Sequence, residues 1–362
     1  MNIRPAVRQL ARKYYEAESE PPKENILDCA LGRNSFGTSE RVIEFAKHYD
    51  WSDLWQHPDT SYKDLKQEIC KFWSDYADLK VANVKVANGS SFVLSRFNKL
   101  FIEPGVKVLG YVPQFSAYMV EVAAMGGKYE AVPLDPQEGF KFNLDRLLSK
   151  IKPDYCIVYI DNPNNPTGQL ISLSDIETIT REAARRDIVV IIDEAYGDYV
   201  EERCSAVNLF NRYKNLVVTR SCTKGYGVGR FRVGYGILPT ELGDYYSRIE
   251  LPFSVSTMGA SLAREAILDQ DFILNTRQQV KAKKEKLTKE LSQRGYLIGE
   301  TCQSCPIFIV GHKDKDVDLK EELLSKGILT ISGIDWENLD KNYARINTPP
   351  SAENFIARLE RE

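Results

Sequence analysis

Two apolar runs, YCIVYID (155–161) and IVVIID (188–193), flank a polar segment (172–187), and this arrangement decides the fold. Apolar residues recur every three to four positions in the polar segment, which is typical of a helix with one buried face. Apolar runs that alternate with such helices indicate a mostly parallel sheet covered on both faces. We therefore expect an α/β fold. The alternation extends from about residue 84 to 240, through KVAN (85–88), VKVLGYV (106–112), NLVVTR (215–220) and VGYGIL (233–238).

The C-terminal third of the chain has a different pattern. A helix-like stretch at about 256–293 leads to weaker strand signals in CPIFIV (305–310) and GILTIS (327–332). A chain of 362 residues rarely folds around one core. We therefore expect a second, smaller α+β domain.

Composition and charge exclude several classes of partner. Hydrophobic residues make up 43% of the chain, charged residues 27%, and the net charge is −3. That balance gives no electrostatic reason to expect nucleic acid or an anionic membrane as a partner. No apolar run approaches the ~20 residues of a membrane span. The basic N-terminus, MNIRPAVRQLARKYY, lacks the apolar core of a signal peptide, so we expect a surface helix there.

The seven cysteines are scattered and odd in number, which is typical of a reduced, cytoplasmic protein. Cys302 and Cys305 form a CxxC motif, but no second pair completes a zinc site. We therefore expect no metal centre. Redox chemistry at this motif remains a minor alternative.

Asp193 stands at the end of a predicted strand, where open α/β sheets place their ligands. A carboxylate there could bind a metal, orient a histidine, pair with a cationic ring or cap the next helix. The three histidines, His48, His57 and His312, all lie far from it in sequence. This distance disfavours the metal and the histidine-based interpretations.

Lys224 follows the next predicted strand, in SCTKGYGVGRFRVGYG. Its glycines follow the lysine, so the segment is not a Walker A loop, and no early strand carries a dinucleotide fingerprint. Ser221, Thr223 and Arg232 suit a phosphate monoester held beside the lysine amine. Taken alone, a surface lysine in a loop is an equally good interpretation.

Four motifs in order resolve these alternatives: DNPNNPTG (161–168), DEAY (193–196), SCTK (221–224) and NYARINTP (342–349). Together they resemble the class I/II aminotransferases, which are fold type I enzymes of pyridoxal 5'-phosphate (PLP). The resemblance covers nearly the whole chain. It is closest to the branch of histidinol-phosphate aminotransferase and threonine-phosphate decarboxylase, on the segments IRPAVRQL (3–10), GRNSFG (32–37) and HPDTSYKDL (57–65).

The resemblance implies a large PLP-binding domain at 40–255, with a mostly parallel seven-stranded sheet between helices. Residues 1–39 and 256–362 would form the small α+β domain. Lys224 would carry PLP as a Schiff base and move a proton, and Asp193 would pair with the ring nitrogen. Residues expected around the ring are Asn165 and Tyr196 at its phenolic oxygen and Phe115 stacked on its face.

The resemblance also assigns a phosphate cup and a substrate site. The cup would comprise Gly89, Ser90 and Ser91 at a helix start, with Ser221, Thr223 and Arg232. Arg345, in YARINTP, would grip a substrate carboxylate, and Asn34, in GRNSFG, would also bind substrate.

Three positions depart from the branch. The tyrosine that reaches the neighbouring subunit's cofactor phosphate is His57 here, and we expect Tyr62 to compensate. Ser35 replaces the usual proline of the N-terminal turn. Ile331 stands where an arginine near the substrate phosphate is usual, which predicts a substrate other than histidinol phosphate.

The resemblance implies a PLP-dependent aminotransferase that moves an amino group between an amino acid and a keto acid or aldehyde. The alternative is an amino-acid decarboxylase or other lyase, similar to threonine-phosphate decarboxylase, because the same cofactor residues serve both. A third alternative is a non-catalytic ligand-binding protein of this fold. We expect a cytoplasmic homodimer with shared active sites, small-molecule substrates, and no nucleic-acid or membrane partner.

Overall fold

The computed structural model describes residues 1–10 and 25–360. Its largest element is a seven-stranded sheet in the order β2-β8-β7-β6-β5-β3-β4. Only β8 runs antiparallel to its neighbours. The expected mostly parallel α/β sheet is therefore confirmed. The strands are β2 (Val84–Ala87), β3 (Lys107–Val112), β4 (Lys128–Pro133), β5 (Tyr155–Asp161), β6 (Val189–Glu194), β7 (Leu216–Ser221) and β8 (Gly234–Ile237).

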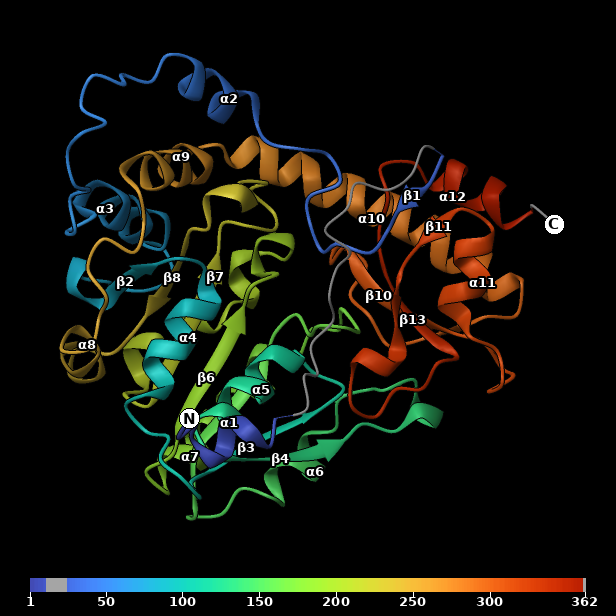
Figure 1. Cartoon of the computed structure of the whole chain (residues 1–362), viewed down its shortest axis with the longest axis horizontal. Helices are drawn as coiled ribbons and strands as arrows, with labels where there is room; N and C mark the ends of the chain where they lie inside the picture. The colour runs from blue at the N-terminus through green and yellow to red at the C-terminus, as the bar shows by residue number, and fades with distance from the viewer. Residues whose placement is uncertain (11–24, 361–362) are drawn as a thin grey trace.

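Helices cover both faces of this sheet (Figure 1). Successive residues of a strand point to opposite faces, so Ile191 packs in the core with α4 and α5, whereas Val190 and Ile192 pack in the core with α3 and α7. This double burial is why the strands are continuous apolar runs. The helices of this part are α2 (Glu40–Lys47), α3 (Lys63–Phe72), α4 (Ser90–Asn98), α5 (Ser116–Ala124), α6 (Leu144–Leu148), α7 (Leu173–Ala184), α8 (Thr240–Ser247) and α9 (Thr257–Leu268).

A second, antiparallel sheet has the order β12-β13-β10-β9, and α10, α11 and α12 pack against it. A two-residue strand, β1 (Leu27–Asp28), pairs with β11 (Ile328–Leu329), so a segment from the N-terminal part of the chain joins this C-terminal region. The expected boundaries at 40 and 256 stay a prediction. The remaining elements are α10 (Gln270–Gln293), β9 (Leu297–Ile298), β10 (Ile307–Gly311), α11 (Leu319–Ser325), β12 (Ile331–Ser332), β13 (Tyr343–Asn347) and α12 (Ala352–Leu359).

Several boundaries differ from the sequence-based expectation. The helix expected at 256–293 is two helices, because Asp269 lies between them and its side chain accepts the N–H of Phe272 at the start of α10. The segment GILTIS divides into β11 and β12. At the N-terminus α1 covers only Pro5–Arg8, and residues 11–15 of the expected surface helix lie outside the described residues. Within the described residues no helix has the length and apolarity needed to cross a bilayer.

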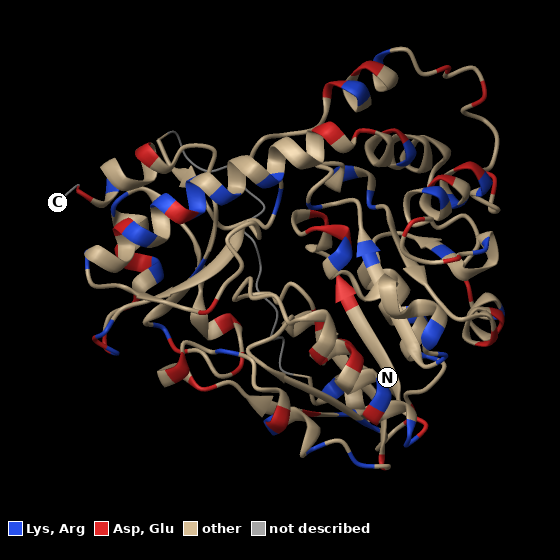
Figure 2. Cartoon of the chain, turned by 180° about the vertical axis from the view of Figure 1, so that it is seen from behind, with Lys and Arg blue, Asp and Glu red and all other residues tan. Residues whose placement is uncertain are grey.

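The register of the large sheet determines which polar residues lie side by side at the ends of its strands. Asp161 at the end of β5 lies beside Asp193 of β6, which in turn lies beside Thr219 of β7. Figure 2 shows the acidic end of β6 next to the basic end of β7, which carries Arg220. The carboxyl ends of three parallel strands thus bring polar side chains to one edge.

Candidate active site

A cavity of about 200 Å³ opens at this edge of the seven-stranded sheet. Ten of the residues that we predicted for the cofactor line it, and Gly89 adjoins Ser90. Asp161, Pro163 and Ala195 also line it and were not predicted. The ten are Ser90, Ser91, Phe115, Asn165, Asp193, Tyr196, Ser221, Thr223, Lys224 and Arg232.

The Lys224 amine lies at the centre of this arrangement. Its Nζ donates to the carbonyl oxygen of Gly32 at 2.6 Å and lies 5.2 Å from the ring centroid of Tyr196. A Cβ at Gly32 would lie 1.9 Å from the Tyr196 hydroxyl oxygen and 3.4 Å from Nζ. Only glycine therefore fits where the N-terminal segment crosses the pocket. We did not predict this residue, because its contact is made by the backbone.

Asp193 is buried and accepts two hydrogen bonds from hydroxyls. Thr219 Oγ1 donates to Oδ1 at 2.9 Å, and the hydroxyl of Tyr159 donates to Oδ2 at 3.0 Å. Burial raises the pKa of Asp193 to about 6; the Thr219 and Tyr159 hydrogen bonds oppose this rise, whereas the nearby charge of Asp161 adds to it. A cationic group in the cavity would favour the carboxylate.

Asp161 holds two segments that line the cavity, those of Phe115 and Asn165. Its Oδ2 accepts the backbone N–H of Asn165 at 2.9 Å and that of Phe115 at 3.3 Å. Its Oδ1 accepts further hydrogen bonds from the side chains of Tyr111, Gln114 and Asn164, each at 3.0 Å. Burial raises the pKa of Asp161, and these donors oppose the rise. Asp161 is the first residue of the motif DNPNNPTG. We did not predict that it would hold the backbone of Phe115 and Asn165, because an aspartate at the end of a strand can have many other roles.

The cup expected for a phosphate is closely packed. Gly89, with φ of +84°, precedes α4, whose first turn holds Ser90 and Ser91. A Cβ at Gly89 would lie 2.8 Å from Arg232 Nη2, and a Cβ at Gly234 would lie 2.3 Å from the backbone nitrogen of Ser90. A guanidinium, hydroxyls and a helix N-terminus suit a phosphate dianion, so these residues fit the phosphate of PLP.

Arg345 contacts a residue that lines the cavity, and Asn34 contacts the loop that follows Lys224. The buried Arg345 donates from Nη1 to Asn165 Oδ1 at 3.0 Å and packs its guanidinium 5.3 Å from the Trp336 ring centroid. Asn34 Nδ2 donates to the carbonyl oxygen of Gly225 at 2.7 Å, and thus holds the loop directly after Lys224.

The structure does not bring His57 or Tyr62 to this cavity. The exposed His57 ring lies 5.0 Å from the ring of Phe253. The buried Tyr62 hydroxyl donates to the carbonyl oxygen of Val255 and accepts its N–H, both at 3.1 Å. That hydroxyl therefore donates and accepts within its own subunit, and the expected roles of His57 and Tyr62 at the neighbouring subunit's site stay a prediction.

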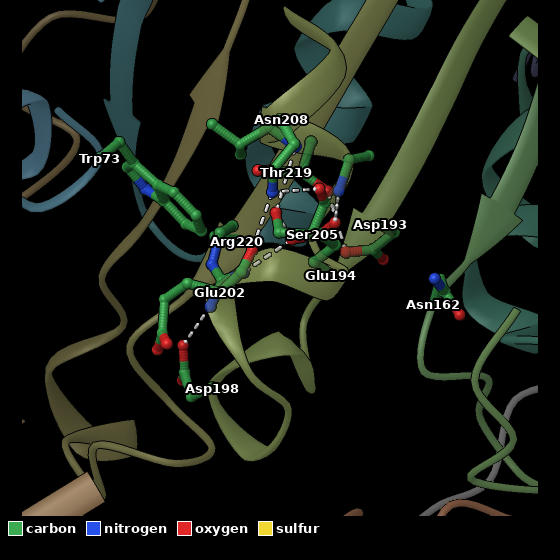
Figure 3. A network of polar contacts seen from close by, with 12 residues as sticks. Trp73, Asn162, Asp193, Glu194, Asp198, Glu202, Ser205, Asn208, Thr219 and Arg220 are labelled. Carbon is green, nitrogen blue, oxygen red and sulfur yellow. Dashed lines mark hydrogen bonds and ion pairs between the residues drawn. The ribbon is translucent and has the colours of Figure 1, made fainter. Parts of the chain in front are cut away.

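A buried ionic network lies behind the site (Figure 3). Arg220 donates to Glu194 at 2.7 Å and to Asp198 at 2.8 Å, and stacks 5.0 Å from the ring of Trp73. The side chain of Asp198 packs so closely on Gly225 that a Cβ there would lie 2.4 Å from Asp198 Cβ. The network thus supports the loop of Lys224. In the described part of the chain, no His, Cys, Asp and Glu side chains form a cluster suited to a metal ion.

Comparison with known proteins gives one consistent result. The family model described as "Aminotransferase class I and II" matches residues 24–357. The chain is similar to histidinol-phosphate aminotransferase from Dehalococcoides mccartyi, with 31% identity over 84% of this chain and 81% of the relative. It is also similar to a putative threonine-phosphate decarboxylase from Caldanaerobacter subterraneus, with 29% identity over 89% of this chain and 86% of the relative.

The fold matches solved structures of the same kind. Histidinol-phosphate aminotransferase from Sinorhizobium meliloti, solved in complex with PLP, superposes with a TM-score of 0.83 at 20% identity and covers 99% of this chain and 96% of its own. A double mutant of aspartate aminotransferase from Thermus thermophilus gives 0.82 at 21% identity, over 92% of this chain and 90% of its own.

Proposed function

Because the chain belongs to the class I and II aminotransferases, and is thus a PLP-dependent aminotransferase of fold type I, we propose how its own residues serve amino transfer. One observation carries the proposal: the Lys224 amine, the Asp193 carboxyl group and the cup around Arg232 line a single cavity. These are the groups that an aldehyde, a ring nitrogen and a phosphate of one small cofactor would need.

When bound, PLP supplies an aldehyde carbon for amine exchange and a ring that accepts electron density from the substrate. Lys224 would hold that carbon and, once released, move a proton at the substrate Cα. The Gly32 carbonyl provides an acceptor for the Lys224 amine when the amine is not bonded to the cofactor. Asp193 would hold the ring nitrogen protonated, oriented by Thr219 and Tyr159.

The remaining residues would orient the ring and its phosphate. Asn165 and Tyr196 would donate to the phenolic oxygen, and Phe115 would pack on the ring face. Asp161 would keep Phe115 and Asn165 in place through their backbone N–H groups. Gly89, Ser90, Ser91, Ser221, Thr223 and Arg232 would hold the phosphate.

For the substrates we propose an amino acid and a keto acid or aldehyde. Arg345 would fork onto a carboxylate, with its guanidinium already oriented by Asn165 and Trp336. The buried Ile331 is the register partner of Arg345 on the adjacent strand. We infer that this apolar side chain takes the position at which the branch usually has an arginine. This supports a substrate other than histidinol phosphate.

We also propose a homodimer in the cytoplasm. Large apolar side chains are exposed beside His57, among them Trp55 at 83% and Leu54 at 71%, together with Phe253. Exposed apolar groups of this size typically mark a protein interface.

The proposed cytoplasmic location is supported by the cysteines, which are all free, as suits a reducing compartment. Acidic and basic residues are interspersed (Figure 2), so we propose no nucleic-acid or membrane partner.

Replacing Lys224 with alanine tests the function. The variant should fold, as judged by circular dichroism, but borohydride should no longer fix PLP to the chain, and turnover should vanish. Lys281→Ala, which removes an exposed lysine of α10, is the matched control and should behave as the wild type. A borohydride-stable adduct in Lys224→Ala would contradict the assignment.

The lyase alternative rests on the similarity to the putative decarboxylase. The holoenzyme should be incubated with a panel of amino acids, with and without 2-oxoglutarate. Amino transfer that requires the keto acid supports the aminotransferase, whereas release of CO₂ without amino transfer would favour the lyase.

A further inference from the structure

Cys302 and Cys305 lie in one tight turn. The N–H of Cys305 donates to the carbonyl oxygen of Cys302 at 3.1 Å, so they are the first and last residues of that turn. The α carbons at such positions lie within about 7 Å, which overlaps the span of a disulfide. Both side chains pack into one apolar cluster with Tyr196, Tyr199 and Ile307. The two side chains therefore share one environment, in which the Cys302 Sγ lies 3.2 Å from the hydroxyl oxygen of Ser304.

Backbone contacts join this turn to the active site. The N–H of Cys302 donates to the carbonyl oxygen of Gly168 at 2.9 Å, and Gly168 ends the motif that carries Asn165. The approach is so close that a Cβ at Gly168 would lie 2.0 Å from the carbonyl oxygen of Ile307. A change in the turn would therefore reach the backbone that positions Asn165.

Lys284 of α10 binds the backbone of the turn. Its buried Nζ donates to the carbonyl oxygens of Cys302 and Cys305, both at 2.8 Å, and to Thr301 Oγ1 at 2.6 Å. Burial raises the pKa of Cys305 to about 12, and the charge of Lys284 opposes this rise. Burial thus outweighs the cation at Cys305, so the more exposed Cys302 is the residue that attacks a disulfide first.

We propose that Cys302 and Cys305 are a reversible disulfide site, oxidised by small-molecule disulfides, and that the bond slows catalysis. Cys302, the more exposed residue, attacks one sulfur of the oxidant, forms a mixed disulfide and expels one thiol. Cys305 then loses its proton and attacks the Cys302 sulfur, expelling the second thiol. The protein loses two electrons and two protons, and the oxidant gains them as two thiols. Only the effect on catalysis rests on the proposed function.

The test treats the holoenzyme with excess oxidised glutathione and maps the digested peptides by mass spectrometry. We expect a peptide that joins Cys302 to Cys305 and has lost two hydrogen atoms. Turnover should fall roughly tenfold, as a small displacement of a positioned group does, and dithiothreitol should restore it. Cys302→Ser should not react at this turn, and Cys305→Ala should stop at a glutathione adduct on Cys302, whereas Cys70→Ser, which removes a partly exposed thiol on α3, should respond as the wild type does.

Three outcomes would overturn the proposal. They are a bond between Cys302 and its neighbour Cys204, a lasting glutathione adduct on Cys302 without the internal bond, and a mapped internal bond with unchanged turnover. If the bond forms but the untreated enzyme transfers no amino group, the disulfide site stands and the proposed function fails. Peptide mapping and the activity assay therefore distinguish the two failures.

Discussion

At the residue scale, two buried carboxyl groups of the cavity differ in the kind of donor they face. Asp193 accepts from the hydroxyls of Thr219 and Tyr159, which can turn to accept instead, and from one backbone N–H, that of Ala195, which the oxygen of an asparagine could still accept. Asp161 accepts backbone N–H groups on one oxygen and side-chain amides on the other, together with the Tyr111 hydroxyl. A backbone N–H group, unlike a hydroxyl, can only donate a hydrogen bond. The same change to asparagine should therefore have different consequences at the two positions.

Asp161→Asn should destabilise the protein, because either orientation of the new amide directs an NH₂ group at N–H donors. We expect a loss of about 2–4 kcal/mol in the free energy of unfolding and weaker PLP binding. Urea denaturation and absorbance titration with PLP would measure both. Asp316→Asn, at an exposed carboxyl group, is the control and should change neither. An unchanged stability in Asp161→Asn would mean that the carboxylate is not needed.

Asp193→Asn should make the cofactor-free protein more stable at neutral pH. The folded-state pKa of about 6 lies above the ordinary value of 3.8, so folding retains a proton between these values. Stability of the wild type therefore falls as pH rises from about 4 to 6, by up to about 3 kcal/mol, and asparagine removes this loss. Denaturation of both apoproteins should show equal stability near pH 4 and a more stable variant at pH 7.5.

The same variant should lose at least about 100-fold in turnover, because the ring nitrogen loses its anionic partner. A stability difference that is constant with pH would contradict the assigned pKa. Unchanged turnover would mean that another group serves the ring nitrogen.

The sequence predicted the residues whose side-chain chemistry is distinctive, such as Lys224, Asp193 and Arg232, and the structure places them around one cavity. It did not predict Gly32 or Tyr159. Gly32 acts through a carbonyl group, which every residue has, and Tyr159 acts only because β5 and β6 lie side by side. Such contacts depend on tertiary structure.

At the scale of elements, the apolar runs from 84 to 238 predicted six of the seven strands of the large sheet, because those strands are buried on both faces. They missed β4, which is a partly exposed edge strand. The small strands were harder to predict. β11 and β12 come from one apolar segment but pair with β1 and β13, respectively. Their division depends on partners that are far apart in sequence, and local periodicity does not report it.

Gly234→Ala tests how β8 positions the start of α4. The new Cβ would lie 2.3 Å from the backbone nitrogen of Ser90, so the start of α4 must move from the position in which it would hold the phosphate. We expect roughly tenfold weaker PLP binding, measured by absorbance titration, and a loss of about 1–3 kcal/mol in stability. Gly243→Ala, where the nearest atom is the flexible end of Lys85 at 3.3 Å, is the control. Equal affinity in both variants would exclude the proposed packing.

At the scale of the whole molecule, the N-terminal segment joins the two sheets at the cavity. β1 adds to the small-sheet region, the carbonyl oxygen of Ala30 accepts from Arg345, and Gly32 then reaches Lys224. Figure 1 shows α10 leading from α9 to the same region. The cavity therefore depends on elements from both parts of the chain. The exposed aromatic residues beside His57 extend this dependence to a second subunit in our proposal.

Mixed dimers test whether His57 serves the neighbouring subunit. His57→Ala should weaken PLP binding and lower turnover at limiting PLP, and Lys224→Ala should be inactive. If His57 acts across the interface, subunits of the two variants combine to form one intact site in each mixed dimer. Turnover after mixing and refolding should then rise to about a quarter of the wild-type value. If His57 acts within its own subunit, every site in the mixed dimer lacks one residue, and turnover stays below that of His57→Ala alone.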